Sequence, residues 1–560
     1  MFGFLTSHGK DAADPLASAR SAAVWLKQLP ALDVIGRQQQ VMRAFEAMRQ
    51  SRKPVDPARM QAVEFLDSAL GTDRRQLIKQ YVENHDATEK LAERIWQATY
   101  VLTQGFLSAY QAGLEEAVSQ SAHSRWKPLV PLLFARLLHY YGTDAKLRVF
   151  RFERWIPAKW IDLHRTYLRA SELGVDRTPA VLTSAGPNAT AWTPEQEYLN
   201  VLLIHQLNTG NLSPSQLDWA CSQLRAWSRR LSLDAMPRSP EGFFVDLAGR
   251  TGLIRRSGHD VGSVLRYLDT TPLAESLDRA VAALRSSEAT DSGPAAPINQ
   301  QRIGVLEKVR PAVAPNVNND LRKDPRVACR VAAKVRIGLH RICRELSAKD
   351  VGEYEAGSEQ IEVFAVSSAP RVRRRAVDEH DSLAASLSSF SDPSWQVKDR
   401  SVAGLRIAAT GGIGQWLALD ALVAVRQSDL SDWVLGVVRR LNKVTTEDAE
   451  AGVSIIAERV VPVVLHTRRD GGDGGIVVNG VDVSTVGARF DGLYLPPPSR
   501  PDKPLAVKTL VVPTSEYAEG RQLVLYTGRS VYTVVLRQLV EQRSEWSWAA
   551  IQIVEKKPKV

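Results

Sequence analysis

The chain has 560 residues, a length that allows roughly three or four domains. Hydrophobic residues make up 44% and charged residues 24%, which excludes a disordered chain and requires real hydrophobic cores. The net charge of +10 comes from 72 Lys and Arg against 62 Asp and Glu, a mixed surface with no zinc-finger, KH or RNP motif, so we do not expect nucleic acid as a partner.

The N-terminus shows no targeting signal. Residues 1–15 lack a basic head followed by an apolar run of about 7–15 residues, so we expect no secretory leader. No run of about 18 apolar residues occurs, so we expect no transmembrane segment. Cys221, Cys329 and Cys343 are too few and too scattered for a disulfide framework or a zinc site, which suits a reducing compartment. These features predict a cytoplasmic protein.

Residues 1–285 are predicted to form an all-helical domain or domains. Apolar residues recur at three- and four-residue spacings, as in Val41, Phe45 and Met48. Two helix starts are clear, because Thr193 and Ser213 each precede a proline and can cap a helix that begins there. The many tryptophans of this half are expected to anchor packed helices, and a lone histidine such as His139 or His205 is expected to be structural.

Residues 286–320 are predicted to be a linker with one short helix. Ser286 to Asn299 is small, polar and contains proline, which is typical of a linker. The short helix is expected from Gln300 to Val309.

Residues 321–466 are predicted to form a small antiparallel β-barrel. Val331, Ala333, Val335 and Ile337 alternate with polar residues, as in a half-buried strand. Further short strand patterns occur at residues 395–398, 405–409, 422–426, 433–441, 451–457 and 460–466. Residues 347–394 are rich in Ser, Ala, Glu and Asp and are expected to form a loop insert.

Residues 476–560 are predicted to form a second β-rich domain. The glycine-rich stretch from Gly471 to Gly475 separates it from the first barrel as a flexible joint. The strand patterns beyond it end at prolines rather than contain them. A second barrel-like domain is therefore expected, and the fold class is α+β and multidomain.

One short motif stands above the background. Asp399, Ser401 and Gly404 have the spacing [D/N]xSxxG, with a strand pattern on each side. The run from Trp433 to Arg440, WVLGVVRR, comes next, and Ala451-Gly452-Val453 begins a later strand pattern. On these residues the segment 321–466 resembles the PilZ family, and the whole layout resembles proteobacterial cyclic diguanylate receptors with a helical N-terminal half.

The resemblance implies an RxxxR arginine motif before the first barrel strand. Arg322 and Arg326 fit and directly precede the strand pattern through Val335, so we favour them. Arg371 and Arg375 also fit and stay open as an alternative clamp, although the segment after them, 376–390, has a poor strand pattern. A second PilZ-like barrel is one interpretation of the β-rich domain at residues 476–560.

The resemblance further implies a six-stranded antiparallel barrel that binds cyclic di-GMP through Arg322, Arg326, Asp399, Ser401 and Gly404. It implies a receptor that relays the level of this second messenger to an unidentified protein partner through the helical half. A PilZ-fold scaffold that binds no nucleotide is the alternative. GxSxG, Walker A and HExxH patterns are absent from the sequence, so we expect neither an enzyme nor a metal site, and no cofactor besides the ligand.

Overall fold

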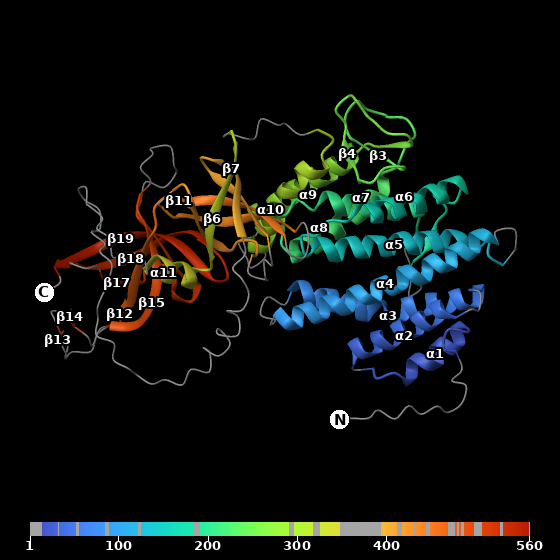
Figure 1. Cartoon of the computed structure of the whole chain (residues 1–560), viewed down its shortest axis with the longest axis horizontal. Helices are drawn as coiled ribbons and strands as arrows, with labels where there is room; N and C mark the ends of the chain where they lie inside the picture. Colours follow the sequence, from blue (N-terminus) through green and yellow to red (C-terminus); the bar gives the residue numbers. More distant parts are fainter. Residues whose placement is uncertain are drawn as a thin grey trace. The chain divides into compact units, whose positions relative to one another are not determined.

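The computed structural model describes residues 14–31, 33–51, 55–83, 89–120, 125–182, 191–290, 296–316, 325–347, 394–410, 417–430, 432–443, 448–468, 477–478, 481–482, 486–497, 507–526 and 530–558. The chain divides into two units, Met1–Asn319 and Asp320–Val560. The described part of the first unit is mostly helical, and that of the second is mostly β-strand (Figure 1). The expected fold class is therefore confirmed.

The described part of the first unit holds ten α-helices. They are α1 (Ala19–Gln28), α2 (Val34–Gln50), α3 (Pro57–Glu83), α4 (Glu89–Ser119), α5 (Val130–Val149), α6 (Pro157–Glu172), α7 (Pro194–Gln206), α8 (Pro214–Trp227), α9 (Thr271–Thr290) and α10 (Ala296–Val313). A short 3-10 helix, η1 (Ser228–Arg230), follows α8.

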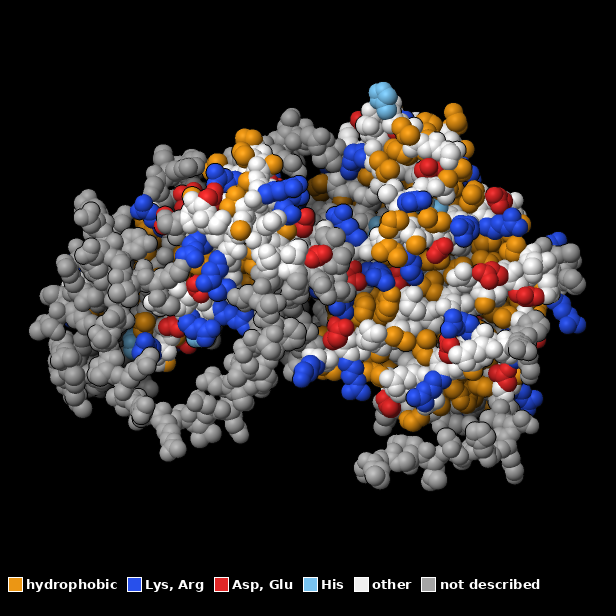
Figure 2. Space-filling model, viewed as in Figure 1, with side chains coloured by type: hydrophobic (Ala, Val, Ile, Leu, Met, Phe, Trp, Pro, Cys, Tyr) orange, Lys and Arg blue, Asp and Glu red, His pale blue; other side chains and the backbone are white. Residues whose placement is uncertain are grey.

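Helix α5 is the centre of this unit, because it packs against α4, α6, α7 and α8. Figure 1 shows α3, α4 and α5 running alongside one another. Phe134, Leu138 and Tyr140 of α5 are fully buried in one large hydrophobic core, which supplies most of the driving force for this half. On the outside, Figure 2 shows basic, acidic and hydrophobic side chains interspersed, in keeping with the mixed composition.

The two predicted helix starts are confirmed. The Thr193 hydroxyl accepts a hydrogen bond from the Gln196 backbone N–H, and the Gln196 side chain accepts one from the Thr193 N–H. Ser213 and Gln216 make the same reciprocal pair at the start of α8. Each box satisfies two backbone donors that a helix otherwise leaves unpaired.

The first unit is not entirely helical. Two short strands, β1 (Ala180–Val181) and β2 (Ala191–Trp192), form a hairpin, and a three-stranded sheet has the order β4-β3-β5. These three strands are β3 (Phe243–Asp246), β4 (Ile254–Arg255) and β5 (Leu265–Leu268). The all-helical expectation was wrong here, because strands of two to four residues are too short to show a periodic pattern.

The expected linker is also largely helical. Helix α9 continues to Thr290, and α10 begins at Ala296 with Pro297 in its first turn, where proline is tolerated. Residues 291–295 lie outside the described residues. The alanine and glutamate residues of this stretch favour helix. The prediction of a linker gave more weight to its small polar residues.

The second unit holds two closed six-stranded antiparallel barrels. The first has the order β10-β11-β8-β7-β6-β9, so that every strand has two neighbours. Its strands are β6 (Val327–Ile337), β7 (Ser394–Ser401), β8 (Gly404–Thr410), β9 (Leu422–Gln427), β10 (Val434–Lys443) and β11 (Ala449–Ala457). Of the expected insert at 347–394, residues 348–393 lie outside the described residues.

The second barrel has the order β12-β15-β16-β19-β18-β17. Its strands are β12 (Val461–Arg468), β15 (Val486–Leu495), β16 (Thr509–Pro513), β17 (Gln522–Tyr526), β18 (Ser530–Gln542) and β19 (Trp546–Pro558), with a 3-10 turn η4 (Thr514–Glu516). Two further short strands, β13 (Val477–Val478) and β14 (Val481–Asp482), pair with each other.

Strand β12 differs from the sequence-based division. The prediction grouped residues 460–466 with the first barrel, but β12 pairs with β15 and β17 and so belongs to the second. The glycine-rich stretch that suggested the boundary follows β12 instead of preceding it. The first barrel nevertheless closes with six strands, because β6 pairs with both β7 and β9.

A helix that the sequence patterns did not predict, α11 (Leu339–Ser347), follows β6. Its apolar face consists of Leu339, Ile342, Cys343 and Leu346, and all four are buried. They share one core with residues of both barrels, including Leu435 of β10 and Trp546 of β19. This helix therefore joins the two barrels through a common hydrophobic cluster.

Candidate functional site

The predicted motif lies on the hairpin between β7 and β8. Asp399 and Ser401 are among the last residues of β7, Gly404 begins β8, and Val402 and Ala403 form the turn. The Ser401 hydroxyl donates a hydrogen bond of 3.5 Å to the Gly404 carbonyl, across the turn. The motif is thus part of a β-hairpin with a two-residue turn, and Asp399 is paired within the strand ladder rather than in a loop.

Gly404 has a packing reason to be glycine. A Cβ atom at this position would lie 2.7 Å from the backbone carbonyl oxygen of Val453 on the neighbouring strand β11. Side chains essentially never tolerate such an approach, so glycine lets β8 and β11 come together at the end of the hairpin.

Asp399 is held between two arginines. Its Oδ1 atom lies 2.5 Å from Nη1 of Arg326, and its Oδ2 atom lies 2.7 Å from Nε of Arg406. The Asp399 side chain is 12% exposed, whereas those of Arg326 and Arg406 are 41% and 47% exposed. The carboxylate is therefore fixed in the wall of the barrel, and the two guanidinium groups reach into solvent from either side of it.

The structure brings together Arg326 and Asp399, two predicted site residues 73 positions apart in the sequence. Antiparallel pairing causes this, because Val327 of β6 lies opposite Arg400 of β7. Ser401 and Gly404 lie on the same hairpin. Arg322, Arg371 and Arg375 lie outside the described residues.

Arg406 is a partner of Asp399 that the sequence patterns did not single out. It lies directly opposite Asp399 in the β7–β8 ladder, and its Nη1 atom is also 3.8 Å from Oε2 of Glu450 on β11. The sequence could have predicted this partner. A two-residue turn at Val402 and Ala403 fixes the register of the following strand, which places Arg406 opposite Asp399.

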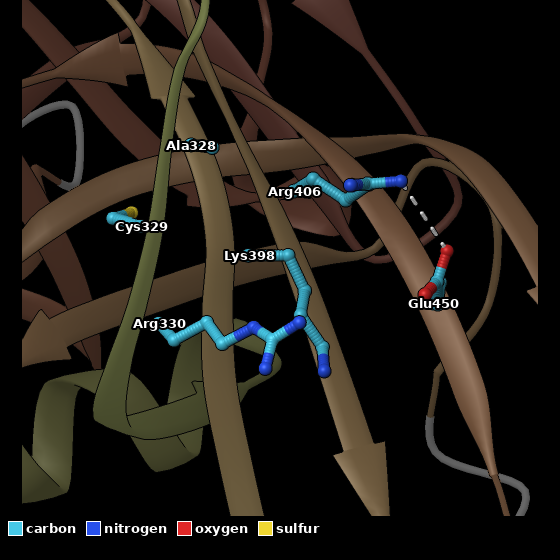
Figure 3. Close-up of a pocket in the computed structure, with 6 residues that line it drawn as sticks. All are labelled: Ala328, Cys329, Arg330, Lys398, Arg406 and Glu450. Carbon is cyan, nitrogen blue, oxygen red and sulfur yellow. Dashed lines mark ion pairs between the residues drawn. The ribbon is translucent and has the colours of Figure 1, made fainter.

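Next to Asp399 the barrel surface is hollowed. The hollow has a volume of about 450 Å³ and is lined by residues of four strands, namely Ala328, Cys329, Arg330, Lys398, Arg406 and Glu450. Figure 3 shows Arg330 extending from β6 toward Lys398 on β7, with Arg406 pointing toward Glu450. Three of the six lining residues are cations and one is acidic, so the hollow favours an anion.

The arrangement suits a ligand with phosphate and base-edge groups. A guanidinium group can fork onto phosphate oxygens and can also stack on a flat ring. A fixed carboxylate accepts hydrogen bonds from N–H donors of a base edge. Among the described residues, no group of three or more His, Cys, Asp or Glu is placed to hold a metal ion. None of the described helices is both long enough and apolar enough to cross a membrane.

Comparison with protein families matches part of the helical half. Residues 20–239 match the family described as cyclic-di-GMP receptor FimW, N-terminal domain. The match runs from α1 past α8 and η1, covers less than half of the chain, and ends before the barrels begin. The matched segment thus lies within the helical half, whereas the barrel hairpin lies outside it. No curated protein matches the chain.

Proposed function

We propose that the protein is a receptor that binds cyclic di-GMP on the outer face of a PilZ-like first barrel. The observation that carries this proposal is the contact of 2.5 Å between Arg326 and Asp399, which joins the two halves of the predicted motif. The similarity of residues 20–239 to the N-terminal domain of a cyclic-di-GMP receptor supports the same ligand from the other half of the chain.

Binding would exchange one partner of Arg326 for another. The ligand's phosphate group attracts the guanidinium of Arg326, which is the more exposed member of the pair. Asp399 keeps Arg406 on its second oxygen, and its first oxygen becomes free to accept an N–H group of a guanine. Arg322, Ser401 and Gly404 complete the proposed binding set, with Arg371 and Arg375 as the alternative clamp.

The output would be a protein contact and not a reaction. Residues 20–239 resemble a receptor domain, and we propose that this helical half carries the signal to a protein partner. Large hydrophobic side chains on its surface, such as Ile156 and Met236, offer contact points for such a partner. Unpaired Cys221, Cys329 and Cys343 agree with the cytoplasm as the place of action.

A scaffold that binds no nucleotide is the second candidate. The observation that favours it is that both oxygens of Asp399 already have arginine partners in the protein. In that case the two ion pairs of Asp399 only stabilise the hairpin, and the protein acts through contacts made by its helical surface.

Calorimetric titration of the full chain separates the two candidates. Cyclic di-GMP should give saturable heat at micromolar concentrations, and GMP, which has one phosphate and one base, should bind far more weakly. The Asp399→Asn variant, which keeps the shape of the side chain, should weaken binding of cyclic di-GMP. If the wild-type chain shows no saturable heat with cyclic di-GMP, the receptor proposal is wrong and the scaffold stands.

A further inference from the structure

Both strand pairs that flank the hollow are interrupted at the same place. Between β6 and β7, Ala328 pairs with Asp399 and Val331 pairs with Val397, so Cys329 and Arg330 together face Lys398. Between β7 and β8, Val397 pairs with Ile407 and Asp399 with Arg406, so Lys398 is the extra residue there. Lys398 is therefore at the centre of two adjoining β-bulges.

Bulges re-aim side chains and are over-represented beside functional sites. Here they turn Arg330 and Lys398 into one hollow from neighbouring strands (Figure 3). The irregular pairing weakens the ladder locally, as do the register shifts between β10 and β11 elsewhere in this barrel. Two cations placed together at such an irregularity repel each other and so do not stabilise the barrel.

The two cations lack an internal counter-charge in the part of the chain that the structure describes. The one carboxylate that lines the hollow, Glu450, faces Arg406, and Asp399 is occupied by Arg326 and Arg406. Neither Arg330 nor Lys398 forms an ion pair with a described residue. Two like charges in one hollow repel each other, and an anion between them relieves that repulsion.

We propose that Arg330 and Lys398 form an anion subsite that receives a phosphate group of the nucleotide. This inference rests on the proposed function and extends it, because neither residue is in the expected binding set of Arg322, Arg326, Asp399, Ser401 and Gly404. In the β6–β7 ladder, Ala328 faces Asp399. Arg326 comes before Ala328 in the chain and Arg330 comes after it, so Arg326 and the subsite lie on opposite sides of Asp399. A ligand with two phosphodiesters can occupy both positions at once, whereas GMP can occupy one.

The test compares Arg330→Gln, Lys398→Gln and the double variant with a matched control, Arg459→Gln. Arg459 is an exposed arginine between β11 and β12 that does not line the hollow. Each single variant should weaken binding of cyclic di-GMP by about tenfold or more, because a charge-assisted hydrogen bond is lost. The double variant should also show a weaker dependence of affinity on salt. Double-variant binding as tight as that of Arg459→Gln would overturn the subsite.

Cys329 provides a readout that does not depend on cyclic di-GMP. It lines the hollow, whereas Cys221 and Cys343 are buried. Pyrophosphate should slow alkylation of Cys329 in the wild-type chain and in Arg459→Gln, and should have no effect in the double variant. If the wild-type chain fails to bind cyclic di-GMP but pyrophosphate protects Cys329, the receptor proposal fails and the subsite stands as a phosphate site. If pyrophosphate gives no protection in the wild-type chain, the subsite is wrong.

Discussion

At the scale of single residues, Asp399 organises the polar face of the first barrel. Its side chain pairs with Arg326 and Arg406 and is less exposed than either arginine. Removing either arginine leaves one oxygen of this carboxylate without its partner and so disturbs the hairpin. Tests of the proposed ligand site must separate this effect from an effect on binding.

The choice of arginine clamp can be decided by substitution. Arg326→Ala should weaken binding of cyclic di-GMP by about 1.5–3 kcal/mol, because a charge-assisted bond to phosphate is lost. Arg322→Ala should behave in the same way, and the Arg371→Ala/Arg375→Ala double variant should bind nearly as well as the wild-type chain. Calorimetric titration measures each affinity. The reverse pattern, with the double variant impaired and Arg326→Ala intact, would assign the clamp to Arg371 and Arg375.

His205 should make the helical unit sensitive to acid. Burial lowers its pKa to about 3, and its ring lies against Trp155 and Trp160 with both centroid distances at 4.5 Å. The unfolded chain takes up a proton near pH 6.5, but the folded chain does not until about pH 3. Stability from the neutral ring is therefore present above about pH 6.5 and is lost as the pH falls toward 3.

The variant His205→Leu removes this titration. Its free energy of unfolding should fall less between about pH 7.5 and about pH 5 than that of the wild-type chain, whatever its stability at the higher pH. Urea unfolding followed by the helical circular-dichroism signal measures the difference. An equal loss in both proteins would show that the ring of His205 does not titrate as its burial indicates.

The sequence was informative about residues whose partners are local. The spacing of Asp399, Ser401 and Gly404 is visible within six residues, and so are the capping boxes at Thr193 and Ser213. Arg330 and Lys398 were missed because bulges determine where they point, and no pattern in one strand reveals an irregularity that arises between two strands.

At the scale of elements, the first barrel depends on close strand packing. Gly436 on β10 is buried, and a Cβ atom there would lie 2.7 Å from the carbonyl oxygen of Ser454 on β11. The backbone cannot move aside without disturbing the ladder between β10 and β11.

The substitution Gly436→Ala should therefore destabilise the barrel by about 1–3 kcal/mol, as overpacking does in other cores. Gly304→Ala on α10 is the matched control, since a Cβ atom there meets nothing within 4 Å and alanine favours helix. Thermal unfolding of both variants should show a loss of stability for the first and no loss for the second. Equal stability of the two variants would contradict the packing argument.

Elements whose pattern was ambiguous account for the errors in the sequence-based division. Helix α11 carries its apolar residues at 339, 342, 343 and 346, a clear helical spacing, but it directly follows a strand and is only nine residues long. Strand β12 was assigned to the first barrel because sequence order does not say with which strand it pairs. Long-range pairing, not local pattern, decides to which barrel β12 belongs.

At the scale of the second unit, the two barrels share structure beyond their connecting chain. Arg439 of β10 forms a bidentate ion pair with Glu541 of β18, with both contacts at 2.6 Å. The Trp546 indole N–H donates a hydrogen bond of 3.1 Å to the carbonyl oxygen of Asp420, which precedes β9. Because of these contacts and the common core around α11, we expect the second unit to unfold as a single cooperative body rather than as two independent barrels.

Trp546→Ala tests this coupling. Trp546 is 1% exposed in the shared core, so its removal should cost about 3–5 kcal/mol. Because the core is shared, amides of β9 and β10 in the first barrel should lose hydrogen-exchange protection together with those of β18 and β19. Val554→Ala, at an exposed position of β19, should leave both barrels protected. If β18 and β19 exchange faster in Trp546→Ala while β9 and β10 stay protected, the barrels unfold separately, and a ligand on the first would have no rigid connection to the second.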